Sequence, residues 1–263
     1  GYYSAVSEGR IEAALGSPIW HEERNSALLF FAGLPFGFDF HHFIAWMGRD
    51  GLRLAQKFYA RDNIRFILCG VMPNDVDAWS LQVLDGAERF QNLPVIADGL
   101  DAKLLARLGV ERLVVDPVDF GASLRSGEAL AVFSSLRAKG YGEQLAVRLK
   151  NRYPREWTSP IVGIELLINL QSWNALSAPQ RRMIEAVCET RALRMLSQSL
   201  SLRAEARRVA SRLEVDEAVW DPAWLGSLVS EWQALLDSLV ATNPDVGAVW
   251  SSIEAFSEEI LEP

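Results

Sequence analysis

The chain has 263 residues, of which 49% are hydrophobic and 23% charged, so it can bury a large core and is not a disordered polypeptide. Its formal net charge of −8 argues against a nucleic-acid partner, because phosphate binding needs a basic surface. Its longest apolar runs, such as residues 27–34, are too short to span a bilayer.

The first 70 residues alternate between predicted helices and strands. An amphipathic pattern predicts a helix from Val6 to Leu15, and apolar positions from Phe40 to Tyr59 predict a helical region with a break at Gly48–Gly51. Ile64 to Cys69 is a predicted strand that Gly70 ends.

Residues 92–115 carry the clearest pattern in the chain. Leu93 to Ala97 is a short apolar run followed by the turn signal Asp98-Gly99, and it predicts a buried strand. Leucines then recur at helical spacing up to Leu108, and Arg112 to Val115 is a second β-branched run. A strand, a helix and a strand in this order predict a parallel crossover.

The elements that follow continue this alternation. Strands are predicted at Gly127–Phe133 and Ile164–Asn169, with a helix at Gly142–Lys150 between them. The alternation favours mostly parallel sheets with helices on both faces.

The last 90 residues are predicted to be helical. Ser177 is a good N-cap, with Pro179 in the first turn, and the helical period then continues for about 35 residues, or roughly 50 Å. Such a helix is long enough to span two lobes. Helices at Pro222–Ala241 and Pro244–Leu261 end the chain and direct several large side chains toward a core, namely Trp224, Trp232, Trp250 and Phe256.

Motifs for catalysis and cofactor binding do not occur. No dinucleotide, phosphate-loop, serine-nucleophile or calcium-loop signature is found, so no cofactor is expected and nothing indicates an enzyme. The histidines lack metal-site spacing, and the carboxylate pair Asp116 and Asp119 is typical of turns. Cys69 and Cys188 are far apart, and unlinked thiols are favoured over a disulfide.

Four sequence blocks, in order and at compatible spacing, carry a family resemblance. They are Leu34-Pro35-Phe36-Gly37 with Ala45-Trp46, the stretch 92–109, Leu124 with Gly127, and residues 164–169 with Trp173, Leu176 and Gln180. From about residue 5 to its end, the chain resembles the dicarboxylate-type solute-binding proteins of TRAP (tripartite ATP-independent periplasmic) transporters.

The resemblance implies a two-lobed periplasmic-binding α/β fold in which a long helix bridges both lobes. Lobe I is expected to comprise residues 1–69 and 170–263, and lobe II residues 70–169. A protein of this kind is periplasmic, closes on one small organic solute and delivers it to integral-membrane TRAP permease subunits. The family's strand, helix and strand before the segment matching Val6 are lacking, which indicates either a shortened chain or a divergent member with a rebuilt first lobe.

The resemblance also assigns positions at the ligand site, several of which are altered. Ile96 stands where the family has an arginine that pairs with the ligand carboxylate, and isoleucine supplies no such contact. Asp75 replaces a frequent glutamine, while Phe133 and Ser134 replace an acidic residue or asparagine and an aromatic residue. The full set of candidate ligand-binding residues is Ile19, Trp20, Phe36, Asp75, Trp79, Ile96, Asp119, Phe133, Ser134 and Trp157. For the aromatic members, core packing is an equally good explanation.

The leading hypothesis is a TRAP-type receptor that binds its solute without the usual arginine. The solute is then neutral, zwitterionic or cationic, or it is an acid held by another basic residue such as Arg125 or Arg137. An interaction or regulatory protein that kept the fold and lost solute binding is the alternative. An enzyme that uses the cleft is the third.

Overall fold

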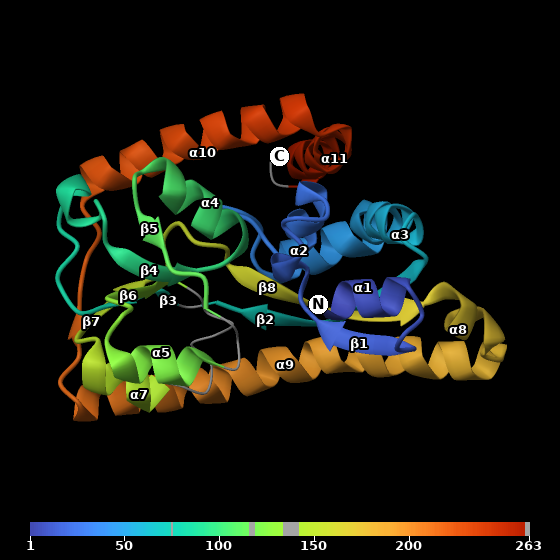
Figure 1. Ribbon diagram of the computed structural model, residues 1–263, viewed down its shortest axis with the longest axis horizontal. Coiled ribbons are helices and arrows are strands. Elements are labelled where there is room, and N and C mark those ends of the chain that lie inside the picture. Colours follow the sequence, from blue (N-terminus) through green and yellow to red (C-terminus); the bar gives the residue numbers. More distant parts are fainter. Residues whose placement is uncertain (75, 116–118, 134–141, 261–263) are drawn as a thin grey trace.

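The computed structural model describes residues 1–74, 76–115, 119–133 and 142–260, which form two β-sheets joined by a long helix (Figure 1). The strands are β1 (Ala13–Gly16), β2 (Ile64–Pro73), β3 (Val76–Ser80), β4 (Pro94–Ala97), β5 (Glu111–Arg112), β6 (Ala131–Phe133), β7 (Asn151–Pro154), β8 (Ile161–Asn169) and β9 (Asp216–Glu217). The helices are α1 (Tyr2–Ser7), α2 (Phe40–Trp46), α3 (Leu52–Ala60), α4 (Gly99–Arg107), α5 (Phe120–Ser126), α7 (Gly142–Arg148), α8 (Leu170–Ala175), α9 (Ala178–Arg212), α10 (Pro222–Thr242) and α11 (Pro244–Ile260). Shorter turns are η1 (Pro18–Trp20), η2 (Ser26–Phe31), the π-helical η3 (Met47–Gly51) and η4 (Ala87–Arg89).

The first sheet has three strands in the order β1-β8-β2, and both pairings are antiparallel. Leu167 of the central strand pairs with Ala14 on one side and Phe66 on the other. The expectation of mostly parallel strands is wrong for this sheet. β2 leads toward the second sheet and β8 returns from it, so the two strands run in opposite directions.

The second sheet is mixed, with the order β5-β4-β6-β3-β7-β9. β4 is parallel to β5 and β6, whereas β3 is antiparallel to β6 and β7. The predicted strand at Leu93 to Ala97 and the helix after it are confirmed as β4 and α4. The second predicted strand, Arg112 to Val115, is wrong in extent, because β5 comprises only Glu111–Arg112. This crossover places the start of α4 at the carboxyl end of a parallel strand, where α/β proteins bind ligands.

Three predictions for the first 70 residues need correction. The predicted helix from Val6 to Leu15 is wrong, because α1 ends at Ser7 and Ala13–Gly16 pairs as an edge strand with β8. The predicted break in the second helical region is a π-helical turn that joins α2 to α3 without interruption. Gly70 does not end β2, because the strand passes it at an irregularity between Leu68 and Gly70.

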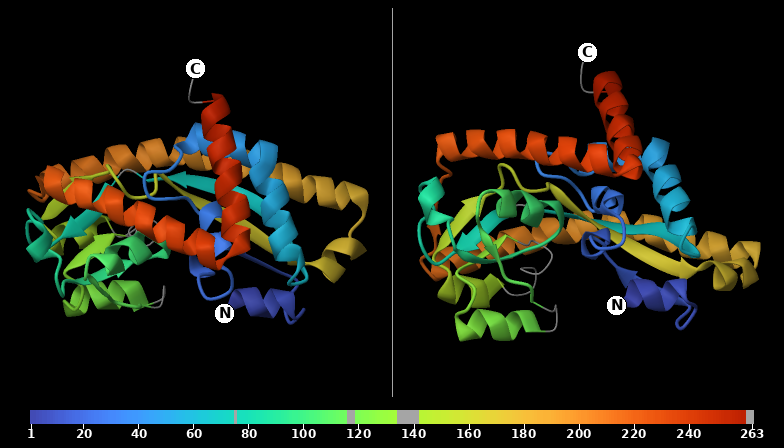
Figure 2. Two further views of the ribbon diagram at one scale, coloured as in Figure 1. Left: turned by 90° about the horizontal axis from the view of Figure 1, so that it is seen from above. Right: turned by 45° about the horizontal axis from the view of Figure 1, so that its top comes forward.

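The predicted long helix is confirmed as α9, which has 35 residues and starts with a capping box between Ser177 and Gln180. It packs against β2 of the first sheet and against α7, and Ala210 near its end lies in one apolar cluster with Val132 of the second sheet. In Figure 1 α9 runs along one side of the molecule and α10 along the other. Figure 2 shows α11 turning sharply away from α10, after the extended residue Asn243.

A disulfide joins Cys69 of β2 to Cys188 of α9. The prediction of unlinked thiols is therefore wrong. The two cysteines are 119 residues apart in the sequence, so no local pattern indicates that they pair. The packing of α9 on β2 brings their Cα atoms to 4.1 Å.

The hydrophobic core crosses the boundaries expected for the lobes. α10 packs against α4, and Trp224 of α10 is buried with residues of the second sheet. The division into residues 1–69 with 170–263 and residues 70–169 stays a prediction. Within the described residues, no helix combines the length and hydropathy that crossing a membrane requires.

Candidate functional site

A small cavity of about 20 Å³ lies between η1 and η2 on one side and the ends of β4 and β6 on the other. It has room for about one water molecule, and most of its lining residues are apolar. The lining residues are Ile19, Leu29, Ala32, Gly33, Asn74, Asp98, Leu100, Asp101, Phe133, Ser159, Ile161 and Val162.

Three polar residues of the lining, Asn74, Asp101 and Ser159, form hydrogen bonds with the segment that leads into β8, and Ser159 Oγ donates to the Ile161 carbonyl oxygen at 2.7 Å. The Nδ2 of Asn74 donates to Thr158 Oγ1 at 3.1 Å and to the Ser159 carbonyl oxygen at 3.0 Å. Asp101 Oδ1 accepts from the Ser159 backbone N–H at 3.3 Å, which ties α4 to this segment. Asp98 is buried, with 4% of its surface exposed. The described lining is thus acidic and contains no lysine or arginine.

Two glycines allow the walls of the cavity to approach closely. Gly99 has a φ of +61°, and a Cβ there would come within 2.6 Å of Ile19 Cγ1. Gly33 has a φ of +118°, and a Cβ there would overlap Ser159 Oγ. Both positions therefore require glycine for conformation and for space.

Two of the predicted ligand-binding residues, Ile19 and Phe133, line this cavity. Trp20 and Phe36 lie at the surface, each with 38% of its area exposed. Asp119 is exposed as the N-cap of α5.

Ile96 and Trp79 lie in a separate apolar cluster with Phe120 and Val132, and Ile96 is 1% exposed. Side chains alternate along a strand, so Val95 and Ala97 face the main core while Ile96 faces this second cluster. Ile96 does not line the described cavity, and its assignment to the ligand site stays a prediction.

The remaining candidates lie outside the described residues, at the surface or in the core. Asp75 and Ser134 lie outside the described residues, as does Arg137, and Arg125 is exposed. Trp157 is fully buried, and its carbonyl oxygen accepts from the Phe36 N–H at 2.8 Å.

Trp157 belongs to an aromatic cluster that backs the cavity wall. Its ring centroid lies 5.8 Å from Phe133 and 5.9 Å from Trp224, and Trp224 in turn stacks on Phe90 at 4.1 Å. The cluster connects the end of β6 with α10, so it fixes the position of Phe133.

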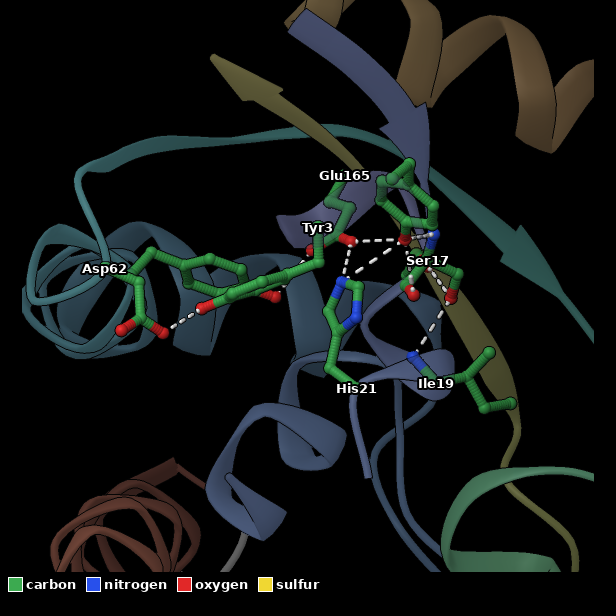
Figure 3. A network of polar contacts seen from close by, with 9 residues as sticks. Tyr3, Ser17, Ile19, His21, Asp62 and Glu165 are labelled. Carbon is green, nitrogen blue, oxygen red and sulfur yellow. Dashed lines mark hydrogen bonds and ion pairs between the residues drawn. The ribbon is translucent and has the colours of Figure 1, made fainter. Parts of the chain in front are cut away.

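Behind the cavity, a buried polar cluster surrounds Glu165 of β8 (Figure 3). The hydroxyl groups of Tyr2 and Tyr59 donate to its two carboxylate oxygens at 2.7 and 2.5 Å, and His21 contacts the same carboxylate. Ser17 extends the cluster, because its Oγ donates to the Gly163 carbonyl oxygen at 2.8 Å and accepts from the Ile19 N–H at 3.4 Å.

Burial, together with the neighbouring Glu165 carboxylate, keeps the phenols of Tyr2 and Tyr59 protonated. Burial first, and then the negative charge of Glu165, raise the pKa of Tyr2 and of Tyr59 well above the ordinary value. Both phenols are therefore protonated at neutral pH and act as donors. Through Ser17 the cluster holds η1, and with it Ile19, against the cavity.

Sequence reasoning missed the polar lining and the Glu165 cluster. The turn signal Asp98-Gly99 directly after a parallel strand marked a place where ligand-contacting groups gather. Glu165 is a charged residue within the apolar run of residues 161–168, which was also a usable signal. The described residues contain no group of three or more His, Cys, Asp or Glu side chains arranged to hold a metal ion.

Comparison with known proteins gives one sequence relative. No protein-family model matches the chain. The monocarboxylate 2-oxoacid-binding periplasmic protein of Nostoc sp. (strain PCC 7120) is 25% identical over 206 residues, which make up 77% of this chain. The matched region spans 56% of that relative's length.

Solved structures match over nearly the whole chain. A TRAP transporter solute-binding protein from Bordetella bronchiseptica, with copurified calcium and picolinate, matches with a TM-score of 0.89 at 23% identity, covering 98% of this chain and 77% of the other. One from Colwellia psychrerythraea, with bound calcium and pyruvate, matches with a TM-score of 0.90 at 18% identity, covering 98% and 79%. The chain has the fold of a TRAP solute-binding protein.

The expected fold class is therefore confirmed, including the two lobes and the long helix that bridges them. In the TRAP solute-binding fold of this chain, the described cavity lies at the contact between η1 and the start of α4.

Proposed function

We propose that this protein is the periplasmic solute receptor of a TRAP-type transporter and that it binds one small organic solute in the cavity between η1 and α4. The observation that carries the proposal is the fold match over 98% of the chain, joined to sequence similarity with a 2-oxoacid-binding periplasmic protein. An integral-membrane TRAP permease is the partner that such a receptor requires.

The cavity supports this role through its lining. Apolar walls with a few fixed polar groups are typical of small-molecule sites, and at about 20 Å³ the cavity must widen to admit a solute. Leu100 and Phe133 supply apolar contact, while Asn74 and Ser159 present backbone-anchored polar groups.

We further propose that the solute is held without an arginine from β4. Ile96 packs in the second apolar cluster, and the described lining contains the carboxylates of Asp98 and Asp101. Carboxylates favour a solute that presents a hydrogen-bond donor or a positive charge, such as an amino or hydroxy acid, over a simple dicarboxylate.

Thermal-shift screening tests the proposal. The panel contains pyruvate and other 2-oxoacids, dicarboxylates, amino acids, amines and sugars, each in excess. A bound solute stabilises the folded state by RT ln(1 + [L]/Kd), or about 2.7 kcal/mol at 100 times Kd. We expect one class of the panel to raise the melting temperature, with calorimetry giving a single site.

Two matched variants locate the binding site. Asp101→Asn changes the charge of the cavity and is expected to weaken binding at least tenfold if a donor group of the solute reaches this carboxylate. Asp237→Asn, an exposed position on α10, serves as the control and leaves the affinity unchanged. A panel that gives no response at all would favour the interaction protein that kept the fold and lost solute binding.

A further inference from the structure

Three charged side chains from opposite sides of the cleft meet beside the cavity. Glu22 follows η1, Lys103 belongs to α4, and Arg112 belongs to β5. Lys103 Nζ lies 2.8 Å from Glu22 Oε1, and Arg112 Nη1 lies 3.0 Å from Glu22 Oε2. Each carboxylate oxygen of Glu22 thus has its own cationic partner.

The cluster is partly withdrawn from water. The side chains of Glu22, Lys103 and Arg112 are 27%, 26% and 33% exposed. Partial burial by itself raises the pKa of Glu22, but the hydrogen bonds and charges of Lys103 and Arg112 outweigh it and hold that pKa below its usual value. Ion pairs in such surroundings are stronger than pairs in open solvent.

Arg112 is anchored to the strand that leads into the cavity. Its Nε donates to the Ala97 carbonyl oxygen at 3.2 Å, directly before Asp98 in the lining. The guanidinium therefore cannot follow Glu22 outward without leaving the end of β4.

The same two segments also meet inside the cavity. Ile19 lies three residues before Glu22, and Gly99 lies four residues before Lys103; a Cβ on Gly99 would come within 2.6 Å of Ile19. A movement that separates η1 from the start of α4 must break the Ile19 contact and both ion pairs together.

We propose that Glu22, Lys103 and Arg112 form a latch that holds the cleft closed. The contacts are made within the chain, so the latch acts in the free protein. The role of the latch in solute entry and release rests on the proposed receptor function. Its effect on the conformation of the free protein does not. A latch that raises the closed fraction of the free protein tightens apparent affinity and slows release.

Small-angle X-ray scattering of the full chain without added solute tests the latch. Glu22→Gln removes the charge and keeps the size of the side chain, and Glu23→Gln is the control at the exposed neighbouring position. We expect Glu22→Gln to increase the radius of gyration and to shift the closed-to-open ratio about tenfold, while Glu23→Gln scatters like the wild type.

Lys103→Met supplies a second route to the same result. If the latch exists, this variant also opens the cleft, and adding Glu22→Gln to it opens the cleft by less than the sum of the two single effects. Far-ultraviolet circular dichroism checks that each variant is folded. If folded Glu22→Gln and Lys103→Met both scatter like the wild type, the latch is overturned.

The outcomes separate the latch from the receptor function. If the variants open the cleft and no solute in the panel binds the wild type, the latch stands and the receptor function fails. If a solute binds the wild type while the variants scatter unchanged, the receptor function stands and the latch fails.

Discussion

Glu165 is a buried acidic residue in the central strand of the first sheet. Its side chain is fully buried in the central strand, and three groups converge on its two carboxylate oxygens, from Tyr2, His21 and Tyr59. These partners come from α1, from the end of η1 and from α3, so one carboxylate joins three separate segments to β8. A buried carboxylate with this many partners is costly to disturb, because the partners lose their acceptor together.

Glu165→Gln should destabilise the fold by about 2 kcal/mol, because an amide has one acceptor oxygen and turns an NH₂ group toward donors that then lack a partner. Urea unfolding at neutral pH measures the change. Glu185→Gln is the matched control: it removes the half-exposed ion pair with Arg65, 2.9 Å long, and should change stability by less than about 1 kcal/mol. Equal stability of the two variants would contradict the role given to Glu165.

Helix α9 is the element that gives the molecule its length. It is 35 residues long and contacts β2 in the first sheet and α7 beside the second. Its first turn is fixed by a capping box, in which the Ser177 side chain accepts from the Gln180 N–H and the Gln180 side chain accepts from the Ser177 N–H. Because the two sheets meet the same helix, its start and direction position them relative to each other.

Ser177→Ala should cost about 1 kcal/mol, because the N–H groups of the first turn lose a side-chain acceptor. Chemical denaturation measures it. Ser197→Ala changes the same side chain on an exposed interior turn of α9, where alanine is the better helix former, and should be neutral or slightly stabilising. A loss of stability at Ser197 as large as that at Ser177 would show that capping is not the cause.

At the scale of the whole molecule, covalent and aromatic contacts hold together segments that are distant in sequence. The Cys69–Cys188 disulfide ties β2 to α9 across 119 residues, and the aromatic cluster around Trp157 ties β6 to α10. The cavity is lined by residues of segments that these connections anchor, including Asn74, which follows β2, and Phe133, which lies 5.8 Å from Trp157.

Replacing both cysteines, Cys69→Ala with Cys188→Ala, should lower the free energy of unfolding by about 4 kcal/mol, because the unfolded chain regains the freedom of a long closed loop. Denaturation with and without a thiol reductant measures it. The reductant should lower the unfolding midpoint of the wild type and leave the double variant unchanged. A wild type that does not respond to the reductant under denaturing conditions would contradict the disulfide.

Local sequence determined the elements whose signals are local. Periodicity and turn residues were sufficient for β4 and α4, and the N-cap Ser177 with the helical period was sufficient for α9, because neighbouring residues decide these structures. Sequence motifs were also sufficient for the fold, since four blocks in order are hard to produce by chance.

Tertiary structure alone decided the contacts between segments that the sequence keeps apart. It made an edge strand of Ala13–Gly16, joined Cys69 to Cys188, turned Ile96 into an apolar cluster and brought Glu22 to Arg112. The tertiary structure alone likewise decided which residues line the cavity. Each of these depends on which distant surface a side chain meets after the sheets have packed, and no local pattern carries that information.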